Sequence, residues 1–185
     1  MSGEYLMKLK VDQDSLLRKR KHHIETSKVN KNYFHHELAV VESENIGKDT
    51  RIWAFAHILP GAVIGNNCNI CDHTFIENDV IIGNNVTIKC GVYLWDAMRI
   101  EDNVFIGPNA TFTNDKYPRS KQTPTKFAPI ILKKGCSIGA NATILPNVTI
   151  GKWCVIGAGA VITQNLPDYS LVVGVPGKVI RKIDQ

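Results

Sequence analysis

Residues 64–88 read IGNNCNICDHTFIENDVIIGNNVTI, and an isoleucine stands at every sixth position of this stretch. The same register extends in both directions through Val40, Ile46, Ile52, Ile58, Ile64, Ile70, Ile76, Ile82, Ile88, Leu94, Ile100, Ile106 and Phe112, and then through Leu132, Ile138, Ile144, Ile150, Ile156 and Ile162. Only Phe112 departs from Ile, Leu or Val. Self-similarity at a fixed period indicates a structural repeat.

A second register lies four residues after the aliphatic positions and carries small or modest side chains. Its members are Ala62, Cys68, Thr74, Val80, Val86, Val92, Val104, Ala110, Cys136, Ala142, Val148, Cys154 and Ala160. A period of six fits neither an α-helix nor simple strand alternation, but it suits a short strand followed by a corner. Asn and Gly fill corners such as 65–67 and 83–85, where the backbone often needs a positive φ. Three sides close one coil, so the sequence predicts an all-β fold, a parallel β-helix that buries both registers.

The repeat is interrupted once, and it ends before the chain does. Twenty residues separate Phe112 from Leu132, which is not a multiple of six, so a loop of about 113–131 must leave the coil. Loops that leave a rigid scaffold are where binding residues concentrate. We therefore predict a β-helix domain over residues 37–185, with this loop and with a C-terminal tail from about 167 to 185.

The net charge of +5 is concentrated before the repeat, in residues 1–36. This arm holds eight Lys/Arg against four Asp/Glu, whereas the rest of the chain holds fourteen against thirteen. No aromatic residue lies between Lys8 and Lys31, which argues against a nucleic-acid module. We expect the arm to be partly helical or flexible, and we assign it no chemistry.

Hydrophobicity and cysteine usage indicate the class of protein. No apolar run approaches the length of a membrane span, and the charged N-terminus is unlike a signal peptide, so we expect a cytoplasmic protein without membrane attachment. Cys68, Cys136 and Cys154 fall in the inward register, where a thiol behaves as a small hydrophobe. Cys71 and Cys90 show no CxxC spacing. We therefore expect reduced, structural thiols and no metal site.

Coils of about eighteen residues place positions eighteen apart next to each other on successive coils, about 4.8 Å apart. One surface column then reads Pro60, Asn78, Asp96 and Asn114, and its companion reads Gly61, Asp79, Ala97 and Asp115. Carboxylates and amides thus gather where the repeat breaks. Asn and Asp are also ordinary turn residues, and for Asn78 and Asp79 that alternative stays open.

Several segments carry a resemblance to a known family. The hexapeptide pattern, its interruption and the closing GVPGKVIR at 174–181 resemble the hexapeptide-repeat acyltransferases, left-handed β-helix enzymes that use acetyl-CoA. KCGV at 89–92, Trp95-Asp96 and FTNDKYPRS at 112–120 are similar to N-acetyltransferases of nucleotide-linked 3-amino sugars. The left hand comes from this resemblance, since parallel crossovers in general are right-handed.

The resemblance implies transfer of acetyl from acetyl-CoA to the 3-amino group of a dTDP-linked 3-amino-3,6-dideoxyhexose used in surface glycans. A UDP-linked 3-amino sugar acid is the alternative acceptor. It also implies a homotrimer whose loop helps to wall a neighbour's active site. The expected catalytic residues are Asp96, Asn114 and His73, the expected sugar-nucleotide contacts are Asn78, Trp95, Asp115, Tyr117 and Arg119, and the expected CoA contacts are Ala158, Lys178 and Arg181.

The chemistry of the residues bears on these roles. Cationic Lys178 and Arg181 suit CoA phosphates, although a solvated tail would have the same composition. Relatives that acetylate hydroxyl groups often carry a catalytic histidine near the loop, and residues 113–131 contain none. An amine acceptor needs a weaker base, and the departing CoA thiolate could take its proton while Asp96 and Asn114 orient the nitrogen. His73 is the alternative base.

Two other classes share this fold. A γ-type carbonic anhydrase binds zinc through three histidines, but the predicted β-helix domain holds only His57 and His73. A non-catalytic trimeric scaffold would keep the prism and lose the site. Trp95-Asp96, the polar loop and the basic tail argue against it.

Overall fold

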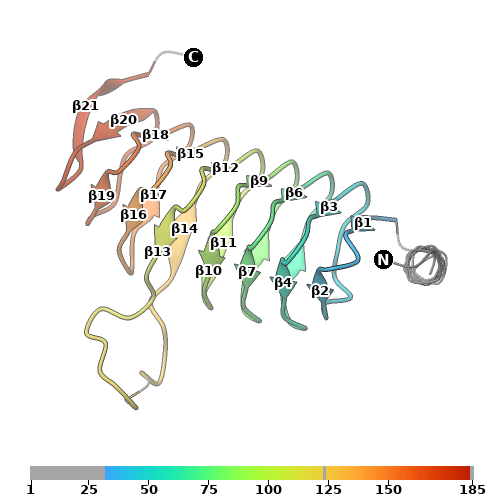
Figure 1. Ribbon diagram of the computed structural model, residues 1–185. Coiled ribbons are helices and arrows are strands. Elements are labelled where there is room, and N and C mark those ends of the chain that lie inside the picture. Colours follow the sequence, from blue (N-terminus) through green and yellow to red (C-terminus); the bar gives the residue numbers. More distant parts are fainter. Residues whose placement is uncertain (1–31, 123, 184–185) are drawn as a thin grey trace, which may run out of the picture. The chain divides into compact units, whose positions relative to one another are not determined.

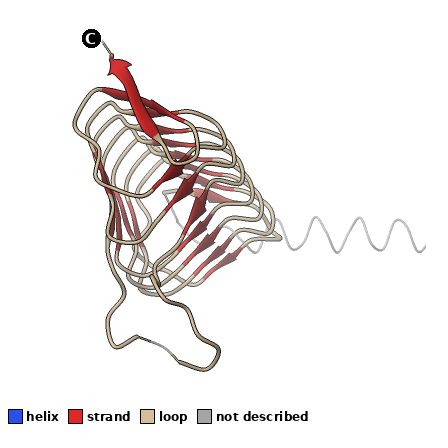
Figure 2. Ribbon diagram, turned by 90° about the vertical axis from the view of Figure 1, so that its left-hand side faces the viewer, coloured by secondary structure: helices blue, strands red, loops and turns tan. Residues whose placement is uncertain are grey.

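The structure is a computed structural model that describes residues 32–122 and 124–183. The chain winds into successive coils, each of which lays short strands on the three sides of a triangular prism (Figure 1). Figure 2 shows the coils stacked along the prism and the loop that leaves one of its corners. Strands of successive coils pair in parallel, so the predicted all-β, parallel β-helix fold is confirmed.

Each side of the prism is one sheet or two sheets in line. The first side contains β1 (Phe34–His35), β3 (Arg51–Ile52), β6 (Asn69–Ile70), β9 (Thr87–Ile88), β12 (Phe105–Ile106), β15 (Ser137–Ile138), β18 (Val155–Ile156), β20 (Ser170–Val173) and β21 (Lys178–Lys182). The second side contains β2 (Val40–Val41), β4 (His57–Ile58), β7 (Phe75–Ile76) and β10 (Tyr93–Leu94), followed by β13 (Thr111–Phe112), β16 (Thr143–Ile144) and β19 (Val161–Ile162). The third side contains β5 (Val63–Ile64), β8 (Ile81–Ile82), β11 (Met98–Ile100), β14 (Ile130–Leu132) and β17 (Thr149–Ile150).

The register explains why the aliphatic residues recur every sixth position. Ile52 pairs with Ile70, and Ile70 pairs with Ile88, so residues eighteen apart are neighbours on successive coils. Side chains alternate along a strand, and the second residue of β3, β6 and β9 points into the prism, where these three isoleucines are fully buried. Both predicted inward registers therefore form the core, except at Val40. Val40 is 52% exposed, because Val41 is the residue that pairs with the buried Ile58.

The corners need backbone conformations that few residues adopt. Asn67, Asn85 and Asn103 occupy successive coils at one corner with φ of 53°, 57° and 60°. Asn tolerates this left-handed conformation better than most residues, because its short amide makes local hydrogen bonds. The frequent Asn at these positions is thus a requirement of the turn.

The predicted boundaries shift by a few residues. The loop spans 113–129, because β14 already begins at Ile130, and the predicted end at 131 is too late. Phe34, which we assigned to the arm, lies in β1 and pairs with Arg51 of β3, so the β-helix begins before residue 37. Residues 1–31 of the predicted arm lie outside the described residues.

The predicted tail closes the last coil. β20 adds to the first side in parallel beside β18, and β21 then pairs with β20 in antiparallel fashion. No helix in the described ranges is long and apolar enough to span a membrane.

Candidate active site

Three carboxylates lie at the corner between the second and third sides, next to the root of the loop. The backbone N–H of Asp96 donates to Oε2 of Glu77 at 2.7 Å, across one coil. The backbone N–H of Asp79 in turn donates to Oδ1 of Asp96 at 2.7 Å. Asp96 is therefore held through its N–H and through one carboxylate oxygen. Its Oδ2 accepts no hydrogen bond from another described residue, so this oxygen is available to a ligand.

Asn78 has a similar place one coil earlier. Its Oδ1 accepts a hydrogen bond from the N–H of Gly61 at 3.1 Å, so the side chain caps the preceding corner. A Cβ on Gly61 would lie 2.7 Å from the carbonyl oxygen of Asn78, which explains the glycine. These contacts agree with the turn-residue alternative for Asn78, and its role in binding the sugar stays a prediction.

Trp95 contacts the strand that precedes the loop. Its Nε1–H donates to the carbonyl of Phe112 at 2.8 Å, and its ring lies 5.8 Å from that of Phe75 and 6.2 Å from that of Tyr93. The indole N–H is thus already engaged, so a contact between Trp95 and a sugar nucleotide would have to use the ring face.

The loop divides into a root and a tip. Asn114 and Asp115 follow β13, one coil beyond β10, and the Asn114 carbonyl accepts the N–H of Ala128 at 3.4 Å. Both therefore lie on the coil next to Asp96. Tyr117 is further along the loop and is 73% exposed.

Contacts of the loop tip are internal to the loop. Asp115 Oδ1 accepts the N–H of Tyr117 at 2.8 Å, and Lys116 Nζ lies 5.5 Å from the Tyr117 ring centroid. Arg119 donates to the Pro118 carbonyl at 3.1 Å. Asn114 and Asp115 thus follow the strand one coil beyond that of Asp96, while the contacts of Tyr117 and Arg119 stay within the described part of the loop, and the roles of all four residues stay predictions.

His73 lies at a different corner, between the first and second sides. Its φ is 57°, and its ring stacks on Phe55 with centroids 4.9 Å apart and planes 11° from parallel. Within one subunit His73 is thus not placed to take a proton from an amine held by Asp96. Its role as a base stays a prediction.

The expected CoA contacts gather at the C-terminal end of the prism. The N–H of Gly157, next to Ala158, donates to the carbonyl of Val172 in β20 at 2.7 Å, and β20 carries β21 with Lys178 and Arg181. Both cationic side chains are exposed. A Cβ on Gly159 would meet nothing within 4 Å, so the corner beside Ala158 is open.

The model of the bacterial hexapeptide transferase family (six repeats) matches residues 45–78, 79–114 and 129–164, more than half of the chain. The chain belongs to this family. The left-handed coil that the resemblance implied is the fold of these hexapeptide transferases.

This hexapeptide transferase is similar to two proteins, and its match covers a different share of the length of each. It is 57% identical over 146 residues to dTDP-3-amino-3,6-dideoxy-alpha-D-galactopyranose 3-N-acetyltransferase of Aneurinibacillus thermoaerophilus, covering 79% of this chain and 76% of that protein. It is 30% identical over 144 residues to the bifunctional protein GlmU of Acetivibrio thermocellus, covering 78% of this chain but only 29% of that protein. The second similarity therefore concerns one part of GlmU.

A solved structure of a variant of AntD, an N-acyltransferase from Bacillus cereus in complex with dTDP and coenzyme A, superposes with a TM-score of 0.55. The two sequences are 22% identical, and the match covers 87% of this chain and 89% of that one. This likeness shows a shared fold.

Glu77 and Arg99 also belong to the hexapeptide transferase's carboxylate corner, although the eighteen-residue spacing does not predict them. Glu77 directly precedes Asn78 of the predicted column, and its carboxylate reaches the next coil. Arg99, the middle residue of β11, pairs with Asp79 at 2.7 Å. The sequence shows that a charged residue stands beside the predicted column in both cases. It does not show in which direction either side chain points.

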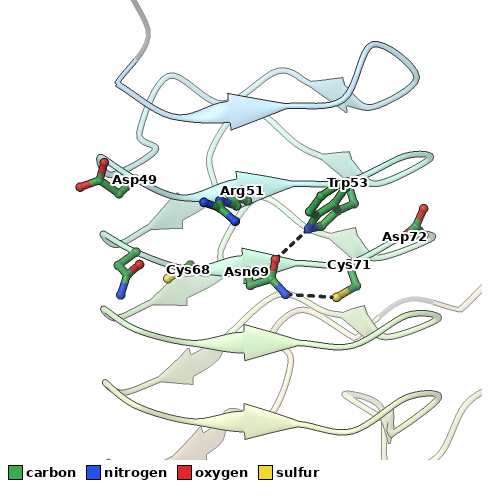
Figure 3. Close-up of a pocket in the computed structure, with 8 residues that line it drawn as sticks. Asp49, Arg51, Trp53, Cys68, Asn69, Cys71 and Asp72 are labelled. Atoms are coloured by element: carbon green, nitrogen blue, oxygen red, sulfur yellow. Dashed lines mark hydrogen bonds between the residues drawn. The ribbon is translucent and has the colours of Figure 1, made fainter.

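A shallow depression on the first side lies apart from the Asp96 corner. It is lined by Asp49, Arg51, Trp53, Asn67, Cys68, Asn69, Cys71 and Asp72 (Figure 3). Trp53 Nε1–H donates to Asn69 Oδ1 at 2.7 Å, and Asn69 Nδ2 donates to Cys71 Sγ at 3.4 Å. These polar groups already bind one another, so we assign the depression no role in transfer.

The buried thiols are poor nucleophiles and poor metal ligands. Burial raises the pKa of Cys68, Cys71, Cys136 and Cys154 above the ordinary thiol value, which keeps them protonated near neutral pH. No cluster of three or more His, Cys, Asp or Glu able to hold a metal occurs in the part of the chain that the structure describes.

Proposed function

We propose that this hexapeptide transferase moves the acetyl group of acetyl-CoA to the 3-amino group of a dTDP-linked 3-amino-3,6-dideoxyhexose, for use in a surface glycan. The observation that carries the proposal is the 57% identity to an enzyme whose name states this acceptor, over 79% of this chain and 76% of that protein. The Asp96 corner supports an amine acceptor.

The reaction forms a C–N bond and breaks a C–S bond. The acceptor nitrogen attacks the thioester carbonyl carbon, the CoA thiolate leaves, and the nitrogen loses one proton. Asp96 Oδ2 can accept a hydrogen bond from the acceptor N–H, which holds the lone pair toward the thioester and compensates positive charge on the nitrogen as it develops. The departing thiolate then takes the proton, and the products are an N-acetylated sugar and CoA.

The alternative acceptor, a UDP-linked 3-amino sugar acid, carries an extra carboxylate that calls for a cation near the sugar. Among the described residues, Arg99 is a cation at this corner, and its guanidinium is already engaged by the Asp79 carboxylate at 2.7 Å. This pairing favours a sugar without the acid group.

We also propose a homotrimer that acts in the cytoplasm, where acetyl-CoA is available. The loop supports the trimer, since the chain leaves the prism after β13 and returns at β14, and the contacts of Asp115, Lys116 and Tyr117 in its described part are with one another. A neighbouring subunit would supply the missing packing surface.

A panel assay tests the acceptor. Purified protein, acetyl-CoA and each of several dTDP- and UDP-linked 3-amino sugars are combined, and the released CoA thiol and the mass of the sugar product are followed. We expect turnover with a dTDP-linked 3-amino-3,6-dideoxyhexose. Turnover with the UDP-linked sugar acid alone, or with none of the amines, would refute the proposal.

A further inference from the structure

The corner that carries Asp96 has a left-handed backbone. Ala97, the residue directly after Asp96, has a φ of 69°. Other left-handed corners of the described prism commonly use Asn or Asp, namely Asp49, Asn67, Asn85, Asn103, Asn109, Asn141 and Asn147. Alanine has no side-chain amide or carboxylate to stabilise that conformation, as is also true of Phe55, His73 and Trp153 at other left-handed corners.

Arg99 binds this corner through three hydrogen bonds. Its Nη1 donates to the carbonyl of Asp79 at 2.6 Å and to the carbonyl of Met98 at 2.9 Å, and its Nη2 donates to Asp79 Oδ1 at 2.7 Å. Asp79 belongs to one coil and Met98 to the next, so the planar guanidinium joins the two coils at this corner. The Asp79 carbonyl also accepts the N–H of Ala97 at 3.0 Å.

The residue that Arg99 holds is the residue that orients Asp96. The N–H of Asp79 donates to Asp96 Oδ1 at 2.7 Å. If Asp79 moved, Asp96 would lose this bond, and its carboxylate would be free to rotate. Rotation would spread Oδ2 over several positions, only some of which suit an acceptor amine.

We propose that Arg99 is a positioning residue for acetyl transfer. It fixes Asp79, the Asp79 amide sets the orientation of the Asp96 carboxylate, and Oδ2 of Asp96 is left to meet the acceptor nitrogen. The Asp79 carboxylate neutralises the charge of Arg99, and the hydrogen bonds of the Arg99 guanidinium are made to other protein groups. Arg99 therefore affects catalysis by positioning Asp96. The inference rests on the proposed amine chemistry but not on the identity of the nucleotide.

The kinetics of Arg99 variants test whether the contacts from Arg99 through Asp79 to Asp96 position the Asp96 carboxylate. We expect Arg99→Gln to lower kcat by roughly 10- to 100-fold, because small misplacements of a reacting group cost this much, while both KM values change by less than about threefold. Arg99→Lys should lose nearly as much, because an ammonium group cannot reproduce the guanidinium geometry. Arg51→Gln is the matched control and should keep wild-type kcat. Arg51 is an exposed arginine of β3 on the first side, and its side chain bonds no other described residue.

A double-mutant cycle separates positioning from general stability. If Arg99 acts through Asp96, Arg99→Gln should cost less than about threefold in kcat when Asp96 is already Asn, although it costs far more in the wild-type background. Independent losses that multiply would overturn the inference. A rise of tenfold or more in sugar KM at unchanged kcat would also overturn it, because Arg99 would then bind the substrate itself. So would a fall in Tm with unchanged kcat.

A crystal structure of Arg99→Gln needs no substrate. We expect the Asp79 N to Asp96 Oδ1 distance to lengthen beyond hydrogen-bonding range, and a retained bond at the present 2.7 Å would overturn the inference. The acceptor proposal fails separately, by inactivity of the wild-type protein on dTDP-linked amines. The cycle is run with whichever amine the wild-type protein acetylates, and inactivity on every amine would overturn both.

Discussion

The substitution Asp96→Asn removes the negative charge of this side chain and keeps its size. In the structure Oδ1 accepts the N–H of Asp79 at 2.7 Å, and an Asn carbonyl oxygen can accept the same bond. The Asn amide nitrogen then replaces Oδ2, so a hydrogen-bond donor faces the acceptor amine where an acceptor stood before. The structure of the corner should therefore be retained, while acetyl transfer is lost.

The expected loss of stability and the expected loss of activity differ in size. Exchanging a charge-assisted hydrogen bond for a neutral one at this partly exposed corner should cost about 1 kcal/mol of stability, or roughly 2–4 °C in Tm for a domain of this length. Loss of a group that orients a nucleophile or compensates its charge typically costs about 10²-fold in kcat, which corresponds to about 2.7 kcal/mol. The loss of activity should thus exceed what the loss of stability can explain.

The assay measures CoA thiol release under saturating acetyl-CoA, together with CoA binding by calorimetry and thermal unfolding by circular dichroism. We expect a folded, CoA-binding protein whose kcat is lower by about 10²-fold or more. A kcat within a few-fold of wild type, with only a lower Tm, would show that Asp96 merely orders the corner. His73→Asn is measured in parallel and should keep kcat within a few-fold. If His73→Asn abolishes turnover while Asp96→Asn does not, the imidazole is the base.

Three further predictions concern other parts of the molecule. Lys178→Ala or Arg181→Ala should raise the KM for acetyl-CoA several-fold, more so at low salt, and leave the sugar KM nearly unchanged; a change in the sugar KM alone would contradict this assignment. A thiol reagent at pH 8 should modify exposed Cys90 in the folded protein and spare Cys136, because burial raises the Cys136 pKa and leaves less thiolate, and the spared thiol should react only on unfolding or as the pH rises far above 8. Light scattering should give the mass of three chains, and deletion of residues 114–128 should lower that mass or abolish activity, whereas a fully active monomer would exclude a shared site.

Most of the prism was determined by the sequence alone. The recurrence of Ile at every sixth position is visible without a structure, and only a coil with three flat sides can bury such residues on all sides at once. The twenty-residue interval after Phe112 likewise required a loop, because a strand register cannot absorb a spacing that is not a multiple of six. Even the separation of His73 from Asp96 follows from the period, since the residue that stacks on Asp96 is Asn78, and His73 lies five residues, about one side of the prism, before Asn78.

The contacts of the site were decided only by the tertiary structure. The period places Asn78, Asp96 and Asn114 in one column, but it does not say whether each side chain faces a ligand or the backbone of the next coil. That choice depends on corner φ values and on which N–H groups lie unpaired nearby. As a result, the structure turns Asn78 toward Gly61 and one oxygen of Asp96 toward Asp79, and it leaves the other oxygen of Asp96 open. The roles of Glu77 and Arg99 depend on bonds between coils, which appear only once the coils are stacked.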